Sequence, residues 1–179
     1  MKRINPPKDV GEAMKAGYQP MFMTGPEIKE HFAPFMLDKK VVDLPEHEKA
    51  NKYDIGERLE TDSELWDRKL TEAKATGEQR YGKDAFARDS RGAWRSFSGP
   101  ELARKGIGPK TSIESTAKEK GLSGYIAVQS EPDNAHGEKR PILGGHHRIA
   151  LSAEQFKDHI FPVKYHSDIS EATGEKGYQ

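Results

Sequence analysis

Apolar residues recur at helical spacing in two stretches of the first half of the chain. Residues 24–35, TGPEIKEHFAPF, place Ile28 and Phe32 on one side of a helix, and the Thr-Gly-Pro-Glu start is typical of a helix amino terminus. Residues 61–75, TDSELWDRKLTEAKA, carry apolar positions at similar spacing, namely Leu65, Trp66, Leu70 and Ala73. We therefore predict two helices, each packing an apolar stripe against a core.

The second half of the chain alternates between helical and strand-like patterns. Residues 111–121, TSIESTAKEKG, predict a short helix that ends at Gly121. Three short apolar runs predict strands at residues 125–128, 141–145 and 160–166, with a helical pattern between the last two. This alternation favours an α/β domain, with an α+β arrangement as the alternative.

The remaining residues indicate appendages around that domain. Residues 1–20 hold three prolines, two glycines and few large apolar side chains, which is the composition of a tail. The charged stretch 38–60 has one strand-like fragment, VVDLP. We predict an N-terminal tail and helical extension over residues 1–58, a domain over residues 59–169, and a C-terminal tail over residues 170–179.

Composition narrows the function classes. Lys and Arg together number 29, as do Asp and Glu, so no overall field attracts the chain to nucleic acid, and any attraction must be local. The absence of cysteine excludes disulfides, thiolate metal sites and thiol nucleophiles. No apolar run is long enough to cross a bilayer, and the start of the chain lacks the core of a signal peptide. We expect a soluble, cytoplasmic protein that does not enter membranes.

A basic and aromatic segment occupies residues 77–110. From Arg80 to Lys110 there are eight basic residues against three acidic ones, with aromatic residues among them. Lys and Arg neutralise phosphates and aromatic rings stack on bases, so this inserted loop is a candidate nucleic-acid interface. The candidates for contact are Arg88, Arg91, Trp94 and Arg95. An alternative interpretation is a surface insertion whose aromatic side chains pack back onto the domain.

Residues 141–155, PILGGHHRIALSAEQ, join an apolar run to a helical pattern through two glycines and three polar side chains. Gly144 and Gly145 allow a sharp turn and close approach of a ligand, beside helix N–H groups that lack intrahelical partners. Arg148 can bind phosphate, and His146 and His147 can donate hydrogen bonds or transfer protons. The turn is therefore a candidate phosphate site, although two glycines also serve simply to reverse the chain.

The order of strand, GGHHR turn, helix and closing PV-containing strand resembles the ParB/sulfiredoxin-like superfamily, and its ParB-like nuclease branch most of all. The resemblance covers roughly residues 60–169, through LWDRKLTEAK, SIESTAKEKGLSGYIAV, ILGGHHRIA and FPVKYH. The opening MFMTGPEIKEH is similar to small bacteriophage proteins of this kind. The resemblance implies a compact domain with a small mixed sheet and flanking helices. It also implies that Gly145, His146, His147 and Arg148 contact the phosphates of a nucleotide or nucleic acid.

Departures from the family pattern restrict this implication. Sulfiredoxin chemistry is excluded, since it needs a cysteine in the turn. Partition ParB proteins continue into a helix-turn-helix and a dimerisation region, whereas thirteen residues follow the last strand here, so a partition role is not expected. Their nucleotide site has G-E-R-R where this chain has G-H-H-R. The resemblance therefore suggests CTP binding without the matching residues. The GER at residues 56–58 follows no predicted strand and is treated as coincidence.

The resemblance also raises nuclease activity as a hypothesis. His146 and His147 are candidates for general base and leaving-group acid, and Glu114 joins them if the helix before the sheet packs as in the family. A divalent cation such as Mg²⁺ and a nucleoside triphosphate are the candidate cofactors. No metal ligand is assigned, because His136, His159 and His166 lack a metal-ligand spacing.

Two functions stay open from the sequence. The first is a phage-type ParB-like protein that binds nucleic-acid phosphate or a nucleotide at GGHHR and cleaves DNA. The second is a catalytically silent protein that docks on a host or virion protein through the extension and the 77–110 segment. The partners expected are therefore DNA or a nucleotide in the first case and a protein in the second.

Overall fold

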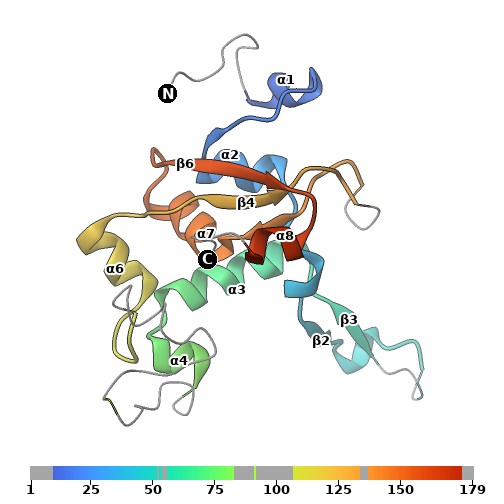
Figure 1. The fold of residues 1–179 in the computed structure, drawn as a ribbon. Helices are drawn as coiled ribbons and strands as arrows, with labels where there is room; N and C mark the ends of the chain where they lie inside the picture. The colour runs from blue at the N-terminus through green and yellow to red at the C-terminus, as the bar shows by residue number, and fades with distance from the viewer. Residues whose placement is uncertain are drawn as a thin grey trace.

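The computed structural model describes residues 10–51, 53, 56–82, 91, 107–133 and 137–174. Its main sheet has four strands in the order β1-β6-β4-β5 (Figure 1). The strands are β1 Phe22–Thr24, β4 Ile126–Gln129, β5 Ile142–Gly144 and β6 Ile160–His166. β4 and β6 are parallel, whereas the β1–β6 and β4–β5 pairs are antiparallel. The predicted compact α/β fold with a small mixed sheet is confirmed.

Three helices, α2, α3 and α7, surround the core. α2 spans Gly25–His31, α3 spans Asp62–Lys74 and α7 spans His146–Gln155. α7 packs against both α2 and α3. α2 and α3 each start with a capping box, in which Thr24 or Thr61 accepts from the third helical N–H and a glutamate side chain accepts from the threonine N–H. These caps explain why both helices begin where the sequence predicts.

Shorter helices complete the described fold. α6, Ile113–Lys120, packs near the carboxyl end of α7 and contacts α3. The others are α1 Val10–Lys15, α4 Gly77–Tyr81, α8 Ile169–Gly174 and the 3-10 turns η1 Met36–Asp38 and η2 Glu46–Glu48. Among the residues described, no helix combines the length and the apolar character needed to cross a bilayer.

The core lies between one face of the sheet and the three main helices. Phe161 and Val163 alternate with exposed residues along β6, as expected of a strand with one buried face. They pack with residues from the other strands and helices, namely Ile28, Phe32, Leu65, Trp66, Ile126, Val128, Ile142 and Ile149. This cluster fixes the position of α7, and therefore of the GGHHR turn at its amino end.

The domain boundary expected at residue 58 does not match the packing. β1 pairs with β6 in the main sheet, with Met23 opposite Phe161, and α2 covers α7. The chain after α2 runs beside β5, where the N–H of Ala33 donates to the carbonyl of Arg140 at 3.0 Å. Residues 22–35 are therefore part of the domain, because their apolar side chains complete its core.

The expected C-terminal tail also begins inside the fold. α8 packs beside the sheet, and Ala172 is fully buried in a cluster with Ala127 and Leu143. Residues 175–179 lie outside the described part of the chain.

A small hairpin, here called the arm, leaves the domain between η1 and α3. It consists of residues 39–60 and contains β2, Val41–Asp43, paired antiparallel with β3, Glu57–Leu59. The arm extends away from the main sheet (Figure 1). The fragment VVDLP thus does form a strand, although the sequence gives no sign of its partner.

The packing of α2 predicts a large loss of stability when Phe32 is truncated. Its side chain is 1% exposed, so Phe32→Ala should lower the free energy of unfolding by about 3–5 kcal/mol. Leu37→Ala is the control, because Leu37 is 78% exposed and its loss should cost less than about 0.5 kcal/mol. Urea unfolding followed by tryptophan fluorescence measures both. Equal effects would show that residues 22–35 do not belong to the domain.

Candidate functional site

The GGHHR turn opens α7 directly after β5. Gly144 ends the strand, and Gly145 adopts a left-handed conformation with φ 102° and ψ 16°. A Cβ atom at residue 145 would lie 2.5 Å from Cδ1 of Ile126 and 3.1 Å from Nη2 of Arg148. Gly145 is therefore required both for the backbone conformation and for the close approach of its neighbours.

The three polar side chains of the turn point in different directions, because consecutive helical residues are about 100° apart. His146 is buried, whereas Gly145, His147 and Arg148 keep partial exposure. His146 faces residues 35–38 and α3, His147 faces α3, and Arg148 faces the loop before β4. The turn is thus one structural unit with three separate polar environments.

His146 uses both ring nitrogens inside the fold. Its Nε2 accepts a hydrogen bond from the Phe35 N–H at 3.1 Å, and its Nδ1 lies 3.1 Å from a carboxylate oxygen of Asp38. Because Nε2 is an acceptor, the neutral ring carries its proton on Nδ1 and donates it to Asp38. Burial, with the nearby Lys69, lowers the pKa of His146 to about 3. These contacts fit a structural role and do not favour the expected catalytic one.

His147 is partly exposed, but its Nε2 is buried. Its Nε2 lies 3.6 Å from a carboxylate oxygen of Glu72, which is longer than a hydrogen bond, and finds no hydrogen-bond partner among the described residues. Burial lowers the pKa of His147, and the Glu72 carboxylate opposes that shift. Burial raises the pKa of Glu72, but His147, Lys69 and Arg68 outweigh it and hold that pKa at about 2. The Glu72 carboxylate is therefore ionised at neutral pH, beside an imidazole that the fold largely buries.

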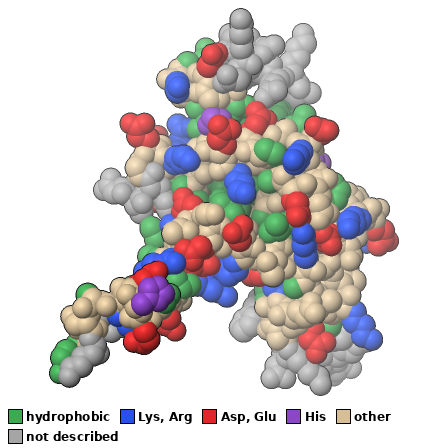
Figure 2. All heavy atoms as spheres, turned by 180° about the vertical axis from the view of Figure 1, so that it is seen from behind, with side chains coloured by type: hydrophobic (Ala, Val, Ile, Leu, Met, Phe, Trp, Pro, Cys, Tyr) green, Lys and Arg blue, Asp and Glu red, His purple; other side chains and the backbone are tan. Residues whose placement is uncertain are grey.

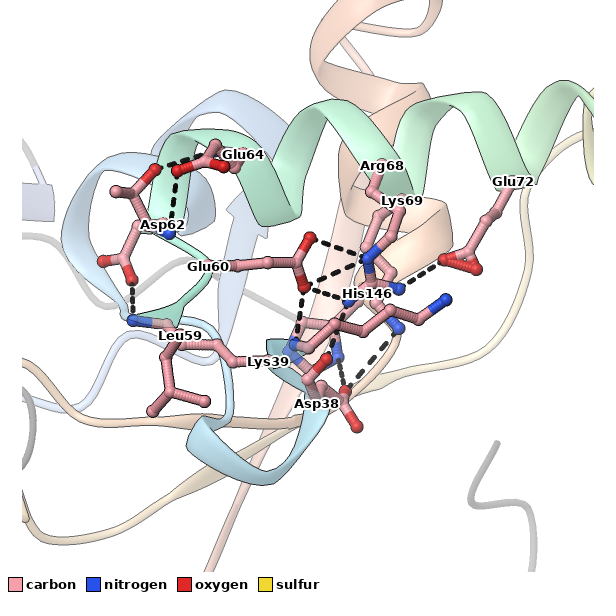
Figure 3. A network of polar contacts seen from close by, with 12 residues as sticks. Asp38, Lys39, Leu59, Glu60, Asp62, Glu64, Arg68, Lys69, Glu72 and His146 are labelled. Carbon is pink, nitrogen blue, oxygen red and sulfur yellow. Dashed lines mark hydrogen bonds and ion pairs between the residues drawn. The ribbon is translucent and has the colours of Figure 1, made fainter. Parts of the chain in front are cut away.

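A network of charged side chains on α3 supports this pair (Figure 3). The Arg68 guanidinium donates to Glu60 through Nε at 2.9 Å and Nη2 at 2.7 Å, and to Glu72 through Nη1 at 2.6 Å. Nη2 also donates to the carbonyl oxygen of Asp38 at 2.7 Å. Glu60 is 5% exposed, and its contact with Arg68 lowers the pKa of its carboxyl. Each buried charge is thus paired, as burial requires.

Arg148 holds the opposite side of the turn. Its Nη1 donates to the carbonyl of Ser123 at 2.8 Å and its Nη2 to that of Tyr125 at 2.9 Å. These bonds hold the guanidinium beside Gly124 and Gly145. Burial together with the Arg148 charge lowers the pKa of His159, which favours its neutral form. Arg148 is therefore the cationic side chain held where α7 begins.

Glu114 is not brought to the turn. It lies near the other end of α7, where Gln155 donates a hydrogen bond to its carboxylate, and Lys118 lies 3.8 Å away. Since α7 has ten residues at 1.5 Å each, the two ends are separated by roughly 13 Å. The expected approach of Glu114 to the histidines fails because α6 packs beside the carboxyl end of α7.

The candidate nucleic-acid residues fall largely outside the description of the structure. Arg91 is exposed, whereas Arg88, Trp94 and Arg95 lie outside the described residues. Within the described ranges, no three His, Asp or Glu side chains are arranged to hold a metal ion.

Four further residues belong to the site although no sequence pattern identified them, namely Asp38, Glu60, Arg68 and Glu72. Of these contacts, only the Arg68–Glu72 ion pair could have been predicted from the sequence, because residues four apart lie on one side of a helix.

Comparisons with known proteins add no assignment. No protein-family model matches the chain, and neither a curated protein nor a solved structure is significantly similar to it. The structure therefore defines an α/β protein with a cluster of charged side chains around the amino end of α7.

The geometry of Gly145 predicts that adding one methyl group there is costly. Gly145→Ala should lower the free energy of unfolding by at least about 2 kcal/mol, from the left-handed backbone and the clash with Ile126. Gly17→Ala is the matched control, because Gly17 also has a positive φ, 90°, but nothing lies within 4 Å of its Cβ position. Urea unfolding should show a smaller loss, about 1 kcal/mol, in the control. Similar losses would contradict the close packing at Gly145.

The state of His146 predicts how stability depends on pH. The unfolded histidine takes up a proton below its pKa of 6.5, whereas the folded one stays neutral until about pH 3. The unfolded chain therefore binds more protons between these values, and stability falls as the pH falls, by about 2 kcal/mol at pH 5 from this group alone. Urea unfolding between pH 7 and 5 measures the slope.

In His146→Gln, the unfolded chain should bind about one proton fewer relative to the folded one, so the slope of stability against pH should be smaller. This holds whatever the effect of the substitution on absolute stability. The control is His47→Gln, which removes an exposed histidine on the arm. An unchanged slope in His146→Gln would mean that this histidine is not held neutral in the fold.

Proposed function

We propose that this protein binds a phosphate group of a nucleotide or nucleic acid at the amino end of α7. One observation carries the proposal: a left-handed glycine opens α7 at the end of a strand, and Arg148 is held beside it. First-turn N–H groups and the positive end of a helix favour an anion, and arginine binds phosphate through paired hydrogen bonds.

Two further features support this location. Gly145, His147 and Arg148 keep partial exposure, so a ligand can reach the first turn of α7. The bonds from Arg148 to two carbonyls fix its guanidinium before a ligand arrives, which lowers the entropy lost on binding. The resemblance to ParB-like proteins, and with it a cytoplasmic setting, belongs to the same proposal.

The proposal extends to hydrolysis of a phosphodiester only through His147. His146 has both nitrogens engaged, whereas His147 has an Nε2 without a hydrogen-bond partner among the described residues and an ionised carboxylate nearby. Because Nε2 is buried against Glu72, Nδ1 is the ring nitrogen left to accept a proton from an attacking water. Phosphate binding does not depend on this step.

Arg148→Ala should weaken binding of DNA or of a nucleoside triphosphate by roughly one to two orders of magnitude, because a charge-assisted contact of about 1.5–3 kcal/mol is lost. Equilibrium titration with single-stranded DNA, double-stranded DNA and each triphosphate measures the effect. Circular dichroism and urea unfolding must show that the variant folds, since Arg148 also holds two carbonyls.

Lys118→Ala is the matched charge control, because Lys118 is exposed and lies near the far end of α7. Normal binding by Arg148→Ala, or an equal loss in both variants, would contradict the phosphate site. His147→Asn should retain affinity while losing cleavage of DNA in magnesium or manganese. If the wild-type protein cleaves no DNA, the hydrolysis step is wrong. Phosphate binding is then judged by the equilibrium titrations alone.

A further inference from the structure

The arm presents large apolar side chains to solvent. Val41 is 60% exposed, Leu59 is 47% exposed, and Tyr53 in the same arm is 82% exposed. Figure 2 shows the arm standing out from the body of the molecule. Exposed apolar side chains on a projecting element are typical of an interaction surface rather than of a folded core.

Two of these side chains lie directly opposite each other. The register pairs Val41 with Leu59 and Asp43 with Glu57, so these four residues share one face of the hairpin, here called the arm face. The Val42–Arg58 pair lies on the other face. Figure 3 shows Leu59 pointing away from α3. The arm face is therefore the side turned away from the main body.

The acidic pair on the arm face is unfavourable for the free protein. Asp43 and Glu57 are exposed and directly opposite, and like charges in that position destabilise a hairpin. Within the described part of the chain, neither carboxylate makes a hydrogen bond or an ion pair. The fold thus gains nothing from these charges, which a cation from outside would neutralise.

The base of the arm is held firmly against α3. Arg58 donates to both carboxylate oxygens of Glu64 at 2.7 and 3.1 Å, and Lys39 lies 2.7 Å from Asp62. Glu60 accepts from the Lys40 N–H at 2.7 Å while it holds Arg68. A surface anchored in this way loses little freedom when a partner binds.

We propose that the arm face docks a segment of another protein that carries Lys or Arg side chains next to apolar ones. Charge complementarity selects this occupant: apolar groups cover Val41 and Leu59, and cations neutralise Asp43 and Glu57. An identical arm face does not fit, because it would bring four carboxylates together. Nucleic acid is repelled by the acidic pair.

A blocked ten-residue peptide of alternating lysine and valine provides the probe. Titrated into the isotope-labelled full chain, it should give saturable NMR shifts at the arm face. Peptides of alternating lysine and serine, or glutamate and valine, should bind at least tenfold more weakly. Equal binding of the lysine–serine peptide, or shifts that are absent or centred elsewhere, would overturn the proposal.

Variants separate docking from folding. Asp43→Lys and Val41→Ser should each weaken lysine–valine binding at least tenfold, and Asp43→Lys should not lower the melting temperature, because it replaces a like-charge pair by an opposite one. Glu119→Lys on α6 is the control with the same charge change and should bind normally. An equal loss in Glu119→Lys would overturn the proposal. So would a concentration-dependent dimer in sedimentation that Val41→Ser dissociates, since a second copy would then be the occupant.

Discussion

The Arg68 guanidinium connects segments that are far apart in the chain. It donates to the Glu60 carboxylate before α3, to the Glu72 carboxylate one turn further along α3, and to the carbonyl of Asp38. A buried charge is tolerated only when it is paired, and removing one partner leaves the other charge unpaired in the low-dielectric interior. Arg68 therefore fixes three elements relative to one another: the base of the arm, α3 and the segment that covers the GGHHR turn.

His146 completes this arrangement from the other side. Its two nitrogens engage the Phe35 N–H and the Asp38 carboxylate, so the chain that follows α2 is fastened to the first residue of α7. Its ring also lies 5.8 Å from that of Trp66 on α3. A histidine in a glycine-rich turn thus serves to close the domain.

Local patterns predicted much of the secondary structure because local chemistry determines it. The threonine caps and apolar spacing fixed the starts of α2 and α3, and a short apolar run identified β6. Placing β1 in the main sheet requires its pairing with β6, more than a hundred residues away, which no local pattern encodes. For the same reason β3 was missed, since Glu-Arg-Leu has no strand pattern apart from its partner.

The candidate site likewise has some features that a local motif predicts and others that depend on distant contacts. The turn at Gly145 could be inferred from the motif, whereas the bonds from Arg148 to the carbonyls of Ser123 and Tyr125 could not. Glu60 could not be identified, because an isolated acidic residue is usually exposed and this one is buried only through Arg68. Glu114 was misplaced, because the end of α7 that α6 approaches depends on the packing of α3, α6 and α7 together.

The same contacts link the two surfaces for which functions are proposed. From Glu60 the network reaches the Lys40 N–H at the base of the arm, and from Glu72 it reaches His147 at the turn. Both connections pass through Arg68, whose guanidinium cannot move toward one carboxylate without weakening its bonds to the other. Proximity of this kind does not by itself make the sites allosteric, because coupling needs two alternative states of the connecting element. The network does ensure that the arm and the turn keep a fixed relation, so that a protein docked on the arm face lies at a defined position relative to the amino end of α7.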